Sequence, residues 1–232
     1  MNSTDFKAHS LTHNEKLYGT VWLIFQTLLF ATLLQTVNLL LSSPLSQPVV
    51  NFLYFAVNFS VVTVVFRNYL HQQGQIVREA MGRILFITVT GFAAYWVLNV
   101  LLTLILFAID PSFTSINDVT IGQLVQQDFL LMFLGTVILV PITEETLFRG
   151  LVFRGLYDKS PVLAWILSVV LFSLVHILGY ISAYPFHTLL LCFVQYLPAG
   201  ILLAAAYRLS GSLLTPILIH ALVNFFGMMA LR

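Results

Sequence analysis

The sequence has little charge. Only 8% of its 232 residues are Asp, Glu, Lys or Arg, whereas an ordinary soluble domain contains about 25%. Hydrophobic residues make up 59% of the chain and the mean hydropathy is +0.95. This composition excludes an ordinary soluble domain and is typical of an integral membrane protein. The polar stretches between apolar runs are too short to build a separate core, so we expect one membrane domain.

The sequence also lacks a basic surplus and paired cysteines. Its formal charge is +1 and its basic residues are scattered singly, which argues against nucleic acid as a partner. The single cysteine, Cys192, lies inside an apolar run. It can therefore form neither an internal disulfide nor a repeated zinc-thiolate pattern, and we expect a small buried hydrophobic residue there.

Long apolar runs are abundant. A bilayer core about 30 Å thick needs roughly 20 helical residues, and about seven runs approach that length. They predict an all-α, polytopic transmembrane bundle of about seven to eight helices. The first run is too long for a signal-peptide core and is expected to remain as a helix. The predicted spans are Tyr18–Leu41, Val49–Phe66, Ile84–Ile109, Phe129–Phe153, Pro161–Ile181, Phe186–Leu209 and Leu213–Leu231.

The connecting segments differ in basic residues, which predicts an orientation. With a cytoplasmic N-terminus, nearly all Lys and Arg residues outside the spans fall on the cytoplasmic side, as the positive-inside rule requires. The opposite connections contain no Lys or Arg, and the segment from Asp110 to Asp128 carries three acids. The inside group is Lys7, Lys16, Arg67, Arg78, Arg83, Arg154, Lys159 and Arg208.

Five ionisable residues remain at membrane depth: Glu144, Glu145, Arg149, His176 and His220. An ionised group at the bilayer centre costs roughly 2.5 to 3.5 kcal/mol on insertion scales, so such residues normally face the bundle interior and carry function. The depth of each residue follows from a rise of 1.5 Å per residue, counted from the cytoplasmic end of its helix. By this estimate the residues of the three spans lie at similar depths of roughly 12 to 22 Å. We therefore expect them to share one site.

Spacing suggests how these residues are arranged. Glu145 and Arg149 are four apart with the acid first, which favours a helical ion pair. Glu144 projects about 100° away and is expected to face a different cavity. His220 and Asn224 are also four apart and share a face. Pro141 removes a backbone hydrogen bond and is expected to open the helix before the two glutamates.

This set of groups is suited to hydrolysis by water. A carboxylate can act as general base, a histidine as proton carrier or metal ligand, and an amide as oxyanion donor. Each residue also has a structural alternative. Either histidine, taken alone, could equally well be a structural residue that bonds a backbone carbonyl. Asn224, taken alone, is more often a group that forms a hydrogen bond between helices. Glu145 and Arg149 are expected to support the site rather than react.

Three motifs appear in order, each within an apolar segment. They are EETLFRG at 144–150, FSLVH at 172–176 and HALVN at 220–224, or EExxxR, FxxxH and HxxxN. Together they resemble the CAAX-protease and bacteriocin-processing family, also called the Abi family. The resemblance covers roughly residues 129 to 227. It divides the chain into a cytoplasmic segment, 1–17, N-terminal transmembrane helices, 18–128, and a catalytic transmembrane region, 129–232.

The resemblance implies an intramembrane endopeptidase that cuts membrane-associated peptides or proteins. Glu144 would activate a water with the help of His176, His220 and Asn224 would stabilise the oxyanion, and Glu145 and Arg149 would support them. His176 and His220 are also candidate ligands for one divalent metal such as zinc, although a metal-free glutamate mechanism satisfies the same motifs. The implied location is a bacterial plasma membrane, and the bacterial members are linked to peptide processing and to immunity against bacteriocins.

Two other classes of function stay open at this point. One is a non-catalytic membrane protein that keeps the motifs for helix packing and gives immunity or regulates an enzyme by binding. The other is a small proton-coupled transporter whose carboxylates and histidines form a relay, although the sequence contains no visible inverted repeat.

Overall fold

The computed structural model describes residues 10–232. Within this range it consists of helices and their connections without a β-strand, so the predicted all-α class is confirmed. The predicted charge at Lys7 and most of the predicted segment 1–17 lie outside the described residues.

Seven helices of the described chain are long and apolar enough to cross a membrane, and they match the seven predicted runs. The first is α2 (His13–Phe25), the π-helical segment η1 (Gln26–Phe30) and α3 (Ala31–Leu39). The second and third are α4 (Gln47–Val65) and α5 (Arg67–Ile109). The fourth is α7 (Phe129–Phe133), η2 (Leu134–Leu139), α8 (Val140–Glu145), η3 (Thr146–Arg154) and α9 (Gly155–Tyr157). The last three are α10 (Pro161–Leu178), α11 (Phe186–Ser210) and α12 (Leu214–Leu231).

Two connections are more ordered than expected. Residues 67–83, expected to connect two spans, are the first turns of the 43-residue helix α5. The chain turns at Phe66 alone (φ −97°, ψ 20°), and the segment that follows contains no proline to end a helix. The second ordered connection follows Asp110 and contains α6 (Ile116–Gln127). The Ser115 hydroxyl caps its start, and the Asp128 carboxylate caps α7 directly after it.

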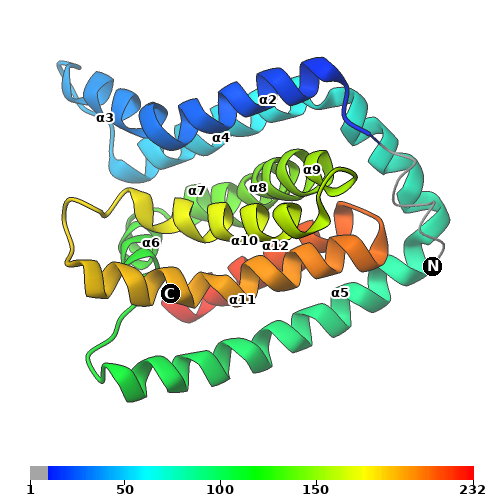
Figure 1. Ribbon diagram of the computed structural model, residues 1–232. Coiled ribbons are helices and arrows are strands. Elements are labelled where there is room, and N and C mark those ends of the chain that lie inside the picture. The colour runs from blue at the N-terminus through cyan, green and yellow to red at the C-terminus, as the bar shows by residue number, and fades with distance from the viewer. Residues whose placement is uncertain (1–9) are drawn as a thin grey trace.

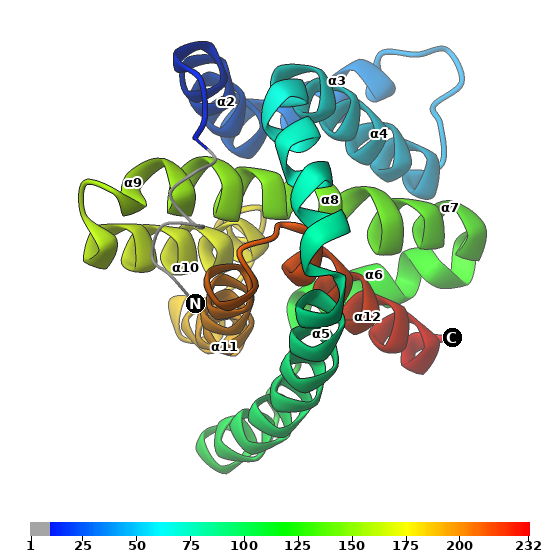
Figure 2. The same ribbon diagram turned by 90° about the vertical axis from the view of Figure 1, so that its right-hand side faces the viewer.

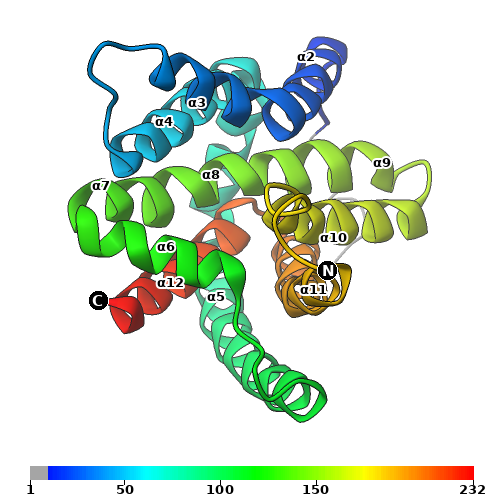
Figure 3. The ribbon, with the colours of Figure 1, turned by 90° about the vertical axis from the view of Figure 1, so that its left-hand side faces the viewer.

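The helices form a bundle in which antiparallel pairs such as α10 and α11 lie beside parallel neighbours such as α4 and the fourth span (Figure 1). The first span (α2, η1 and α3) and α4 form a pair on one side of the bundle. The fourth span and α10 lie in the middle, and α11 and α12 lie beyond them. Helix α5 leads from the first pair to the opposite side of the bundle (Figure 2) and packs against α11 and α12. Helix α6 lies beside α7 and α12 (Figure 3), so the connection returns over the middle of the bundle.

The outer surfaces of α2, α3 and α5 expose many large apolar side chains, among them Leu28, Phe86 and Leu104. A soluble monomer rarely exposes such contiguous apolar surface. The helical backbone of the spans satisfies most of its own hydrogen bonds, which is the arrangement that a hydrocarbon environment requires. The chain is therefore built as an integral membrane protein.

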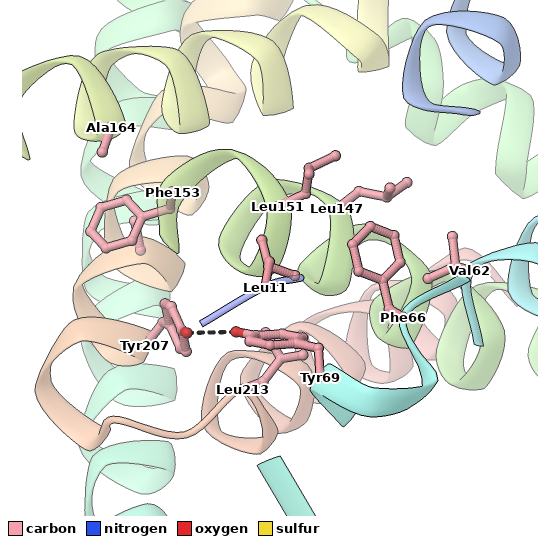
Figure 4. Close-up of a cluster of buried hydrophobic side chains, with 11 residues drawn as sticks. Leu11, Val62, Phe66, Tyr69, Leu147, Leu151, Phe153, Ala164, Tyr207 and Leu213 are labelled. Atoms are coloured by element: carbon pink, nitrogen blue, oxygen red, sulfur yellow. Dashed lines mark hydrogen bonds between the residues drawn. The ribbon is translucent and has the colours of Figure 1, made fainter. Parts of the chain in front are cut away.

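One hydrophobic cluster joins the cytoplasmic ends predicted for several spans (Figure 4). It contains Phe66 and Tyr69 at the α4–α5 junction, Leu147 and Phe153 of η3, and Tyr207 of α11. The hydroxyls of Tyr69 and Tyr207 are hydrogen-bonded to each other at 2.6 Å within this cluster. This contact ties the N-terminal half to the helices that carry the motifs.

A buried carboxylate fixes the start of α5. Phe66 has no side-chain oxygen to cap the helix, and Glu15 of α2 supplies one instead. Its Oε1 accepts a hydrogen bond from the Tyr69 backbone N–H at 2.8 Å, while Oε2 accepts two from Thr12. An anion at a helix N-terminus satisfies a free N–H and favours the helix dipole. Glu15 is 2% exposed, so water does not replace it.

Replacing Glu15 is therefore expected to destabilise the fold. Glu15→Ala leaves the buried N–H of Tyr69 without an acceptor, which costs about 1–3 kcal/mol. Thermal unfolding in detergent should show a lowered midpoint. Glu79→Ala is the control, because Glu79 is exposed on α5 and should leave the midpoint unchanged. Equal midpoints for the two variants would contradict this role of Glu15.

Candidate active site

The fourth span widens into π-helix just before the paired glutamates. In a π-helix the carbonyl of residue i bonds the N–H of residue i+5, as between Gly135 and Val140 in η2. The next such bond would join Thr136 to Pro141, and proline has no N–H. The Asn224 amide of α12 donates to the Thr136 carbonyl instead, at 2.8 Å. The predicted effect of Pro141 is thus confirmed, and Asn224 has a structural contact.

Glu145 lies at the centre of a buried polar cluster. Its Oε1 accepts from Arg149 Nη1 at 3.1 Å, one turn further along the chain, and lies 2.9 Å from His220 Nδ1 on α12. Both Glu145 and Arg149 are fully buried. The predicted ion pair is confirmed, and the same carboxylate oxygen also orients a histidine that the motif places 75 residues away.

Arg149 reaches two further helices from the same position. Its Nη2 donates to the Gly200 carbonyl of α11 at 3.0 Å, and its guanidinium carbon lies 4.4 Å from the centre of the Phe172 ring of α10. The guanidinium therefore satisfies a backbone carbonyl and packs on an aromatic face as well as neutralising Glu145.

Glu144 faces a different environment, as its helical position predicts. Its Oε2 lies 4.0 Å from His176 Nε2, and the two side chains keep 22% and 15% of their exposure. A gap of this length is too long for a direct hydrogen bond and suits a bridging water. Glu144 is thus the accessible member of the pair of glutamates, and Glu145 is the enclosed one.

The orientation of His176 follows from its neighbours. Its Nδ1 lies 2.7 Å from the Phe172 carbonyl one turn earlier, and a carbonyl can only accept, so Nδ1 carries the proton. Nε2 is then left with a lone pair facing Glu144. The imidazole is stacked on Tyr196 of α11, with 4.1 Å between ring centroids and 23° between planes. These contacts hold the ring in one position.

Two cavities meet at Glu144 and His176. The α4-side cavity, about 380 Å³, is lined by residues of η1, α3, α4, α6, α8 and α10. The α12-side cavity, about 390 Å³, is lined by residues of α5, α6, α8, α10, α11 and α12, including His220 and Asn224. Both linings contain Glu144, His176 and Asn117, so an extended chain occupying both would pass the Glu144–His176 pair.

The structure therefore brings all six predicted site residues together from three spans. Their chemical roles stay predictions. Sequence reasoning missed other polar groups of the α12-side cavity, among them Asp118 and Tyr196. Asp118 was expected in an outer connection, although the Ser115–Asp118 spacing of a helix start was a usable signal. Tyr196 is one aromatic residue among many in an apolar run, so the sequence gives no sign of it.

The donor atoms fit a metal centre poorly. Both histidines have a free Nε2, because each Nδ1 is engaged. A catalytic zinc needs three protein ligands, and the described residues contain no group of three or more His, Cys, Asp or Glu side chains that could hold a metal ion. Glu145 is committed to Arg149 and His220. His176 and His220 thus lack the third ligand.

Comparison with known proteins agrees with the motifs. Residues 126–226 match the family described as type II CAAX prenyl endopeptidase Rce1-like. The chain is also 30% identical over 95 residues to the UPF0177 protein YxdF of Lactococcus lactis, a match that covers 41% of this chain and 47% of that protein. The chain thus spans about half the length of the curated relative it matches. No solved structure matches.

The contacts that Glu145 and Arg149 make besides their own ion pair predict the behaviour of a charge exchange. Four-residue spacing alone predicts that Glu145→Arg combined with Arg149→Glu restores an ion pair. In the structure the exchanged arginine would face His220 and the exchanged glutamate would face the Gly200 carbonyl, so we expect the double variant to be no more stable than either single one. Breaking a buried pair costs about 3–5 kcal/mol. Membrane yield and thermal unfolding in detergent measure this, and recovery in the double variant would show that the pair acts alone.

Proposed function

Since residues 126–226 match the type II CAAX prenyl endopeptidase Rce1-like family, we propose that the chain is an intramembrane endopeptidase that hydrolyses membrane-associated peptides or proteins. The observation that carries the proposal is the Glu144–His176 pair at the junction of two cavities. A carboxylate and a neutral imidazole 4.0 Å apart can hold one water between them, and a peptide in the two cavities would present its backbone to that water.

The proposed reaction begins with water activation. The water donates one proton toward Glu144 Oε2 and the other toward His176 Nε2, which leaves its lone pair free to attack a peptide carbonyl. Glu144 takes up a proton as the new C–O bond forms, and the tetrahedral intermediate then breaks its C–N bond. The proton held by Glu144 passes to the leaving amine. A general base positioned in this way contributes typically 10²–10⁴-fold to the rate.

The oxyanion would form on the side of α12. Asn224 has a second amide proton besides the one given to Thr136, and His220 Nε2 lies on the cavity side of a ring whose Nδ1 is held by Glu145. In its protonated form His220 donates through Nε2. Two donors held by fixed partners can stabilise developing charge without rearrangement. Glu145 and Arg149 would act by positioning His220 and the helix that carries Glu144.

The setting of the enzyme is part of the proposal. The similarity to a Lactococcus protein supports a bacterial plasma membrane, and the distribution of Lys and Arg supports a cytoplasmic N-terminus. We propose peptide processing or immunity against bacteriocins as the biological role of this activity. The alternative of a non-catalytic immunity or regulatory protein is separated from the proposal by the experiment that follows.

The test compares wild type with Glu144→Gln in a host that lacks the gene. Glutamine keeps the size of the side chain but cannot accept the proton, so we expect new peptide termini in membrane and secreted fractions with wild type only, or at least 10²-fold less of them with Glu144→Gln. Mass spectrometry of peptide termini measures this. Glu79→Gln at matched expression is the control. Identical termini in all strains, with the phenotype kept by Glu144→Gln, would establish the non-cutting alternative.

Metal removal provides a separate prediction. Because the donor set of the site lacks a third ligand, prolonged treatment of the purified protein with a strong chelator should leave the cleavage rate of an identified substrate unchanged. Activity that is lost on chelation and restored by zinc would instead assign His176 and His220 as metal ligands.

A further inference from the structure

The proposed mechanism leaves one acid of the α12-side cavity unused. Asp118 lies in the first turn of α6, where the Ser115 hydroxyl accepts from its backbone N–H at 3.4 Å. An acid at this position favours a helix start through the helix dipole. Asp118 also lines the cavity that contains Glu144, His176, His220 and Asn224. Helix capping explains its place in the helix, and its position in the cavity needs a second explanation.

The surroundings of Asp118 form a polar pocket with aromatic walls. The side chains of Ser115 and Gln195 lie within reach of its carboxylate, and His176 lines the same cavity. The side chain of Asp118 is exposed at the cavity, and partial desolvation by the surrounding protein raises the pKa of its carboxyl group above the usual range. The Tyr95, Trp96 and Tyr196 rings line the same cavity.

A second group in this pocket lacks a partner. The side-chain oxygen of Gln195 is buried and has no hydrogen bond to any of the described residues. A buried carbonyl without a donor costs free energy, so such atoms in native proteins commonly meet a ligand or water. An amide oxygen accepts hydrogen bonds, and the missing group is therefore a donor.

The cavity holds two carboxylates and, apart from its two histidines, no basic group among the residues that the structure describes. Its acids are Asp118 and Glu144, and the described residues that line it include no Lys or Arg. Carboxylates, an amide oxygen and aromatic faces together form the environment that an ammonium or guanidinium group requires. The C-terminal carboxylate of a peptide placed beside Asp118 would instead face a like charge, which costs free energy.

From this arrangement we propose that the α12-side cavity binds a lysine or arginine side chain of the substrate beside the bond that is cut, with Asp118 as its ion-pair partner and the Gln195 oxygen as a second acceptor. This inference rests on the proposed endopeptidase activity. It specifies an internal peptide bond next to a basic residue as the substrate class. Asp118 is then a specificity-determining residue, and Tyr196 contacts both this subsite and the imidazole of His176.

The experiment compares the termini that depend on wild type with those made by Asp118→Asn, Asp118→Glu and Asp118→Lys at matched expression. With wild type, Lys or Arg should recur at one fixed position within about two residues of the cut. Asp118→Asn should reduce these termini about tenfold or more, Asp118→Glu should retain them, and Asp118→Lys should favour Asp or Glu there. Asp110→Asn is the matched control, because Asp110 is in the same connection but lines neither cavity.

A second experiment changes the substrate instead of the enzyme. Because it uses the wild-type protein, its result cannot be caused by a folding defect. Once a substrate is identified, replacing its basic residue by glutamine should slow cleavage about tenfold or more, and no enzyme variant is needed. Termini without a recurring basic residue, or cleavage that is insensitive to both changes, would overturn the subsite while the endopeptidase stands. Wild-type termini that persist in Glu144→Gln would overturn the proposed function and the subsite with it.

Discussion

The carboxylate of Glu145 is the contact on which the site depends. Taking a carboxylate and a guanidinium out of water costs several kcal/mol per ion, and their attraction offsets this only when further hydrogen bonds complete the geometry. Here Arg149 also donates to the Gly200 carbonyl and lies on Phe172, and Glu145 also holds His220. The helices α8 and η3, α10, α11 and α12 are thereby fixed at one depth. Loss of either Glu145 or Arg149 leaves the other as an uncompensated buried charge.

The π-helical segments of the fourth span explain how one helix serves both structure and site. Pro141 leaves the Thr136 carbonyl without its i+5 donor, and Asn224 satisfies it from α12. In a regular α-helix the Thr136 carbonyl would accept a hydrogen bond from the Val140 N–H, so it would not need a donor from Asn224. The irregular backbone is tolerated at membrane depth because it is buried in protein and lines a cavity. The proline and asparagine of the motif region are therefore coupled through a backbone carbonyl.

Sequence reasoning predicted the parts of this structure that obey simple periodicities. Seven apolar runs predicted the spans, and helical spacing predicted both the ion pair of Glu145 with Arg149 and the separate orientation of Glu144. The long helix α5 was divided, because its first turns are polar and a hydropathy argument ends a span where charge begins. The Gly200 contact had no signal, since a backbone carbonyl carries no residue identity. Asp118 was assigned to an outer connection, because chain position between spans does not reveal that α6 folds back over the cavity.

The two adjacent glutamates show why chemistry cannot be read from residue type alone. Glu145 is fully enclosed and paired with Arg149 and His220, so its contacts hold neighbouring helices together. Glu144, one residue earlier and about 100° around the helix, has a single imidazole at 4.0 Å and keeps part of its exposure to two cavities. A base must gain and lose a proton in each turnover without disturbing the packing around it. Of the two, Glu144 is the carboxylate that makes no hydrogen bond to another helix of the described chain, and for that reason it is the one proposed as the base.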